Sequence, residues 1–129
     1  MFSVHKNDTG AVAPWEYLGA AAGTYAAGQA LTVTGGKLAA IAAASKTTPQ
    51  YICMSDITVA AGELVPVIRV ANDTIYETKL TAAAEAATVG TKLEVSAGGL
   101  GVDAAAAGTF EVTYIEDTAE GAAVYGRFA

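Results

Sequence analysis

The sequence predicts an all-β chain, and three observations lead to this prediction. Apolar and polar residues alternate with a period of two in several segments, such as Leu31–Thr34 and Thr74–Leu80. Glycine pairs such as Gly35-Gly36 separate the alternating segments, as in tight hairpins. Only a short Ala-rich segment, 81–88, has helical character. We expect a small β-sandwich or barrel of two pseudo-repeated hairpin units, preceded by an irregular N-terminal arm.

The first segment, 1–23, has no clean periodicity and is predicted to be this arm. It contains polar residues, Pro14, and the aromatic residues Trp15 and Tyr17. Large aromatic side chains usually find a packing partner, so these two indicate docking onto another surface. The β domain is expected to span 24–129.

The strands of the first part follow from the alternation. Leu31–Thr34 and Lys37–Ile41 are predicted to form a hairpin around Gly35-Gly36. Tyr51–Met54 is expected to be a short buried strand, and it contains the only cysteine, Cys53, which we expect to be buried. Leu64–Val70 is a further strand, in which Pro66 predicts an edge or bulged position.

The second part repeats this pattern after a turn or two of helix at 81–88. Further strands are predicted at Leu93–Ser96, Leu100–Val102, Thr109–Ile115 and Ala123–Phe128. Gly28–Leu38 matches Gly90–Leu100 at an offset of 62 residues, with identical residues at five positions. Two half-repeats, 24–80 and 81–129, would explain the match, and so would the chance similarity of hairpins rich in Leu, Val and Gly.

The residue inventory predicts no catalytic, cofactor or metal site, and hence a protein that is not an enzyme. The only histidine, His5, lies in the polar arm, and one His and one Cys cannot form a thiolate–imidazole metal cluster. A Gly-x-Gly-x-x-Ala string at Gly99–Ala104 lacks the long helix that a dinucleotide-binding loop requires. Glu116 and Asp117 are adjacent, so on a strand they would point to opposite faces.

Charge and hydropathy exclude two classes of partner. The formal net charge is −6, and the seven basic residues are spread singly, so no nucleic-acid-binding patch is expected. The longest apolar stretch, Leu38–Ala44, is too short to cross a bilayer, and no signal peptide is apparent at the start of the sequence. We therefore expect no membrane partner and synthesis in a cytoplasm.

Several features together resemble the head decoration proteins of tailed bacteriophages. The chain is short, acidic and rich in Ala, Gly and Thr, and it carries the hairpin Gly28–Leu38, the strand Tyr51–Met54 and the closing run Val65–Val70. The resemblance covers residues 24–128 in general character. It implies a structural virion protein on the outer surface of the capsid, with the major capsid protein as its partner and a homotrimer or homodimer as its form. Under this reading Trp15, Tyr17, His5 and Lys6 are the candidate capsid contacts.

Two other functions fit the same residues. A β-sandwich recognition module for carbohydrate would gather Tyr17, Tyr25 and Tyr125 on one exposed face. A tube or shell subunit would assemble into large particles without a partner.

Overall fold

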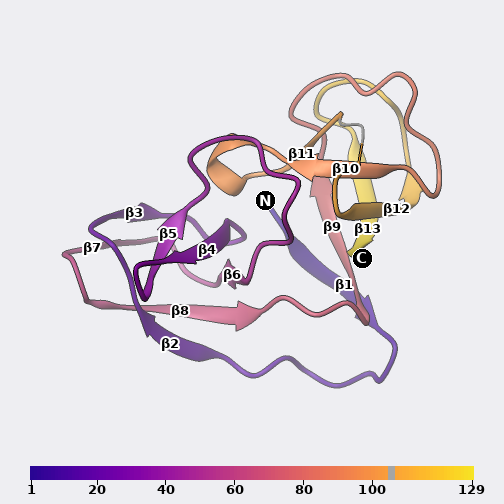
Figure 1. Cartoon of the computed structure of the whole chain (residues 1–129). Coiled ribbons are helices and arrows are strands. Elements are labelled where there is room, and N and C mark those ends of the chain that lie inside the picture. Colours follow the sequence, from indigo (N-terminus) through magenta and orange to yellow (C-terminus); the bar gives the residue numbers. More distant parts are fainter. Residues whose placement is uncertain (105–106) are drawn as a thin grey trace.

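The computed structural model describes residues 1–104 and 107–129, and it confirms the prediction of an all-β fold (Figure 1). A six-stranded sheet has the order β1 (Ser3–Asn7), β9 (Thr74–Lys79), β13 (Ala123–Phe128), β12 (Phe110–Ile115), β10 (Lys92–Val95) and β11 (Val102–Asp103). A five-stranded sheet has the order β2 (Glu16–Gly19), β8 (Leu64–Arg69), β6 (Tyr51–Cys53), β4 (Ala30–Thr34) and β5 (Lys37–Ala40). A two-stranded sheet pairs β3 (Gly23–Tyr25) with β7 (Ile57–Val59).

Helical structure in the described residues is limited to one 3-10 turn, η1 (Ala97–Gly99). The helical turns expected at 81–88 do not form, because the backbone of this segment bonds elsewhere: the Ala84 N–H donates to Thr118 O at 2.9 Å. No helix among the described residues is long and apolar enough to cross a membrane.

The β4–β5 hairpin forms as predicted. Thr34 pairs with Lys37 across Gly35 and Gly36, whose φ angles are 59° and 79°. Positive φ at both central positions gives a turn whose twist matches that of the two strands.

The two large sheets repeat the same strand pairing. The order β2-β8-β6-β4-β5 in one corresponds to β9-β13-β12-β10-β11 in the other. The registers also correspond. The first-half pairs Glu16↔Val67, Cys53↔Val67 and Leu31↔Tyr51 are equivalent, in this order, to the second-half pairs Tyr76↔Gly126, Val112↔Gly126 and Leu93↔Phe110. The equivalent halves therefore run from β2 to β8 and from β9 to β13. The division expected from the sequence, 24–80 and 81–129, places β9 in the wrong half and leaves β2 out.

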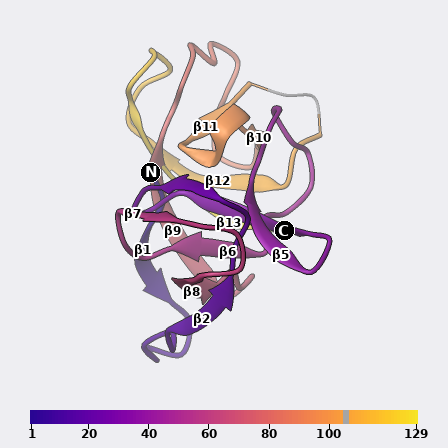
Figure 2. The ribbon, with the colours of Figure 1, turned by 90° about the vertical axis from the view of Figure 1, so that its left-hand side faces the viewer.

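Each half curls so that the end of its first strand approaches its last strand: β2 approaches β5, and β9 approaches β11. In the first half Ala20 forms a parallel bridge with Leu38, and in the second half Leu80 forms one with Val102. The backbone bonds match as well, since the Ala21 N–H donates to Leu38 O and the Thr81 N–H donates to Val102 O. Figure 2 views the molecule from the side of the first half, where the strands wrap around a common centre.

The curled halves have separate apolar cores. The first core contains Ala20, Tyr25, Leu31, Leu38, Tyr51, Cys53, Val59, Val65 and Val67. The second core is larger because it merges with the contact between the halves, and its largest members include Phe2, Ile52, Ile68, Tyr76, Phe110 and Phe128. Cys53 is fully buried and free, as predicted.

The halves are joined by backbone contacts as well as by packing. Ser45 and Val95 exchange a pair of N–H to O bonds at 2.8 and 2.9 Å. The buried Gln29 side chain donates from Nε2 to Gly98 O at 2.9 Å. A Cβ atom on Gly99 would lie 2.2 Å from Ala30 O, so only glycine allows this approach of the two backbones.

Residues 1–23 are not an irregular arm. They supply β1, which pairs with β9, and β2, which pairs with β8. Phe2 is buried among the rings of Phe110 and Phe128, with centroid distances of 5.9 and 5.7 Å. The alternation is missing because β1 is an edge strand whose residues are nearly all exposed, with a register shift between Val4 and Lys6.

The expectation that Pro66 marks an edge or a bulge is also wrong. β8 lies between β2 and β6, and Pro66 is in regular register opposite Tyr17. The Pro66 carbonyl faces β6, where it accepts a hydrogen bond from the Met54 N–H at 2.9 Å. An N–H group at position 66 would point in the same direction as this carbonyl, toward Met54. Because β6 ends at Cys53, the missing N–H breaks no hydrogen bond between paired strands.

Candidate functional site

The most prominent exposed apolar feature lies in the first seventeen residues. We call Met1, Val4, Val12, Trp15 and Tyr17 the N-terminal surface; these are five of the large apolar side chains that the described residues leave exposed. Val12 is 92% exposed, Trp15 51% and Tyr17 59%. Single exposed apolar residues are common, whereas a contiguous apolar patch indicates an interaction site, and Val4, Val12 and Trp15 line one hollow.

Trp15 borders a hollow between residues 4–15 and the five-stranded sheet. The hollow has a volume of about 400 Å³, and its apolar lining comes from β1, from the 10–15 segment, from Met54 and from Ile68 of β8. Lys6 lies at the same hollow, so the structure brings together two of the four candidate contacts, Trp15 and Lys6.

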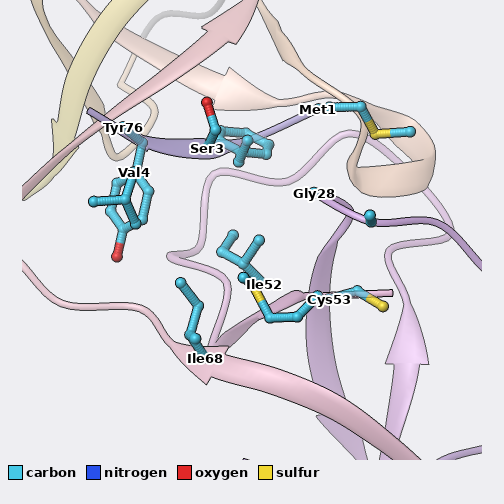
Figure 3. A pocket seen from close by; sticks show the side chains of 11 residues that line it. Met1, Ser3, Val4, Gly28, Ile52, Cys53, Ile68 and Tyr76 are labelled. Carbon is cyan, nitrogen blue, oxygen red and sulfur yellow. The ribbon is translucent and has the colours of Figure 1, made fainter. Parts of the chain in front are cut away.

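A second hollow, of about 350 Å³, adjoins the first and shares Val4, Met54 and Ile68 with it. Figure 3 shows Val4 and Tyr76 from the six-stranded sheet on one side of it, and Ile52 and Ile68 from the five-stranded sheet on the other. The hollow therefore lies where the two sheets meet, and its walls are almost entirely apolar.

The other two candidates lie apart from the first hollow. His5 stacks on Tyr125 of β13, with ring centroids 4.6 Å apart and an interplanar angle of 29°. Tyr125 in turn lies 5.5 Å from Tyr114, so these three rings form a row across the six-stranded sheet. Tyr17 lies on β2, the edge strand of the other large sheet.

Two exposed ion pairs connect the segment that carries Trp15 to the large sheets. At its start, Asp8 receives two hydrogen bonds from Arg127 of β13, at 2.9 and 3.1 Å. At its end, Glu16 pairs with Arg69 of β8 at 3.2 Å. The hydrogen bonds from Arg127 lower the pKa of Asp8 below its ordinary value, because they stabilise the carboxylate. The segment is thus tied to both large sheets.

Among residues 1–104 and 107–129, no group of three or more His, Cys, Asp and Glu side chains is placed to hold a metal ion. Burial raises the pKa of the Cys53 thiol, which donates to Ser55 O at 3.1 Å, so the thiol form is favoured over the reactive thiolate.

The tyrosine face expected for carbohydrate recognition does not form. Tyr25 is buried, with 3% of its surface exposed, and its hydroxyl donates to Ala21 O at 2.7 Å. Tyr17 and Tyr125 belong to different sheets. The expectation failed because the inward or outward orientation of a tyrosine depends on the register of its strand.

Sequence reasoning named Trp15 and Tyr17 but missed Val4, Val12, Met54 and Ile68. Val4 and Val12 are apolar residues in a polar segment, and this was the available signal. Met54 and Ile68 reach the hollow only through the fold. Comparison with known proteins finds no protein-family model that matches the chain and no significant match to a curated protein.

Proposed function

We propose that this chain is a structural virion protein that binds the outer surface of a phage capsid through its N-terminal surface. The observation that carries the proposal is the exposure of Trp15 at the hollow that Val4 and Val12 also line, with the exposed Tyr17 two residues further along a segment that ion pairs connect to both sheets. Trp and Tyr are the residue types that most often dominate binding energy at protein interfaces. The resemblance to phage head decoration proteins supplies the kind of partner, the major capsid protein.

In this proposal the protein acts by contact and not by chemistry. A homotrimer or homodimer would present two or three copies of the N-terminal surface to neighbouring capsid subunits. Linked contacts of this kind raise the effective concentration of each further contact and strengthen binding well beyond that of one copy. Binding across joints between subunits would reinforce the shell.

Cosedimentation with decoration-free, expanded heads of the parent phage tests the proposal. We expect the wild-type protein to pellet with the heads and Trp15→Ala to bind roughly 30-fold more weakly, as for the loss of about 2 kcal/mol at an interface hot spot. Tyr114→Ala is the matched control, because Tyr114 is 53% exposed but lies on β12 of the other large sheet.

Two results would contradict the proposal. Wild-type protein that stays in the supernatant with its own heads would refute capsid binding. Equal losses for Trp15→Ala and Tyr114→Ala would mean that the N-terminal surface is not the contact. A glycan array probed with the isolated protein is expected to be silent, and a specific signal would favour carbohydrate recognition instead.

A further inference from the structure

The two halves differ at one edge. In the second half, β1 covers the outer edge of β9. The equivalent strand of the first half is β2, and within the described residues no strand pairs with its outer edge. Figure 1 shows β2 at the lower margin of the molecule with β8 on its inner side only. The internal equivalence thus identifies an edge that is covered in one half and open in the other.

The equivalence extends to individual residues. In the second half, β9 pairs with β13 through Tyr76↔Gly126 and Glu77↔Tyr125. In the first half, β2 pairs with β8 at the equivalent places, through Glu16↔Val67 and Tyr17↔Pro66. β1 covers β9 through the pairs Ser3↔Glu77 and Lys6↔Ile75, among others. The corresponding open positions on the first half are therefore Tyr17 and Trp15. Beyond Gly19 the edge is closed, because Ala20 bridges Leu38 of β5.

The backbone of Tyr17 is oriented for a further strand. Its neighbour across β8 is Pro66, whose carbonyl points the other way, to the Met54 N–H of the β6 side. Two directly opposed antiparallel residues either bond to each other or both point away from each other. The N–H and C=O of Tyr17 therefore point away from β8, toward the open edge.

The open edge lacks a bulge, a lysine and a proline that would block pairing along β2. Natural edge strands are shielded by short length, charged side chains, Pro or a bulge; β2 is short and begins with Glu16, but it contains no Lys or Pro and keeps a regular register with β8. Tyr17 on β2 and Trp15 directly before this strand are both more than half exposed. Such an edge can accept an extended peptide, with main-chain hydrogen bonds for affinity and side-chain contacts for specificity.

We infer that the edge at Trp15 and Tyr17 accepts an extended segment of the capsid subunit as an added antiparallel strand. The inference rests on the proposed capsid-binding function and names how the partner is held. The strand β1 indicates the chemistry, since it is polar, carries His5 and Lys6, and lies beside Glu77. The open edge carries Glu16, which is paired with Arg69 of β8, and the chain as a whole has a formal net charge of −6. An uncharged or basic segment fits this edge better than an acidic one.

Substitutions at Tyr17 separate the backbone from the side chain. Tyr17→Ala removes the ring and keeps the N–H, whereas Tyr17→Pro removes both. Proline is tolerated on an edge strand where its N–H position faces solvent, so β2–β8 pairing is retained. Thermal unfolding of the two variants should therefore agree within a few degrees.

The assay is cosedimentation with decoration-free, expanded heads, combined with residue-resolved amide exchange. We expect Tyr17→Pro to bind roughly tenfold more weakly than Tyr17→Ala, the effect of one lost hydrogen bond. In the free protein the Tyr17 amide should exchange fast, and the Leu18 amide, which faces β8, slowly. On heads the Tyr17 amide should become protected. The Glu77 amide should be protected in both states, because β1 covers it.

The outcomes distinguish the two proposals. Wild-type protein that does not bind heads refutes the capsid-binding function. If the wild type binds heads but both Tyr17 variants bind equally and the Tyr17 amide stays fast, the added strand is refuted and the function stands. If the free protein is a dimer that Tyr17→Pro converts to a monomer, a second copy occupies the edge and the inference is overturned.

Discussion

Replacing Phe2 with Ala tests whether the first segment is part of the fold or an arm that needs a partner. Phe2 is 2% exposed and packs on Phe110 and Phe128, and its N–H donates to Gly28 O at 2.7 Å. Removing a buried Phe side chain typically destabilises a protein by about 3–5 kcal/mol, through lost burial and the cavity left behind. A domain of this size is stable by only about 5–15 kcal/mol, so the loss is large.

The effect is measurable as a shift in the melting temperature. For 129 residues with an unfolding entropy of about 2.1 cal/mol/K each, this loss lowers Tm by roughly 11–18 °C. Circular dichroism of the isolated protein gives the Tm without any partner present. Val12→Ala is the control from the same segment, because Val12 is 92% exposed and its loss should change the stability by less than about 0.5 kcal/mol. A Phe2→Ala protein that melts together with the control would refute the integration of the segment into the core.

Three further predictions follow from single contacts. Gly126→Ala should destabilise the protein by about 1–3 kcal/mol in urea titration, because the new Cβ would lie 2.5 Å from Glu111 O and 2.6 Å from the Phe110 ring; added Phe110→Leu should relieve part of the loss, and full additivity would contradict this cause. The lowered pKa of Asp8 means that its ion pair with Arg127 stabilises the fold at neutral pH and is lost as the pH falls below about 4, so the acid-induced fall in Tm should be smaller in Asp8→Asn; identical pH profiles would argue against it. The buried Cys53 should react with a thiol reagent only at the rate of unfolding, and fast labelling of the native protein would show that the site is open.

The parts of the fold that local sequence determines were predictable. The β4–β5 hairpin follows from two adjacent glycines between alternating segments, and the turn and both strands carry their own signals. Trp15 and Tyr17 are exposed, and their role as docking residues stays a prediction. These features require no knowledge of what lies across the sheet.

The parts that depend on distant contacts were not predictable. β1 has no alternation because nearly all its residues are exposed, and its partner β9 lies about seventy residues further along the chain. Pro66 predicted an edge strand, but it lies on β8 between two other strands. The proline is tolerated there because β6 ends at Cys53, before the position opposite Pro66. The hollow beside Trp15 needs Met54 and Ile68, which only the assembled sheets bring to it.

The equivalence of the two halves is visible in the sequence at only a few positions, and the structure shows why. Gly28 and Gly90 occupy equivalent turns with φ of 86° and 92°, and their N–H groups donate to Cys53 O and Val112 O, respectively. A positive φ restricts the residue type, so glycine recurs here and the echo is visible. Other equivalent backbone bonds are made by different residues: the Ala21 N–H donates to Leu38 O in the first half, and the Thr81 N–H donates to Val102 O in the second.

Within the sheets, equivalence constrains volume more than identity. The position opposite Cys53 is Val67, whereas the position opposite Val112 is Gly126, where the Phe110 ring fills the space that a side chain would need. The two halves therefore share a register but have different side chains in their cores. The same reasoning applies to the outer edges: the backbone of β2 and β9 is equivalent, and what differs is only the strand that covers it. The open edge at Tyr17 is for this reason best understood as a pairing site whose second strand comes from another chain.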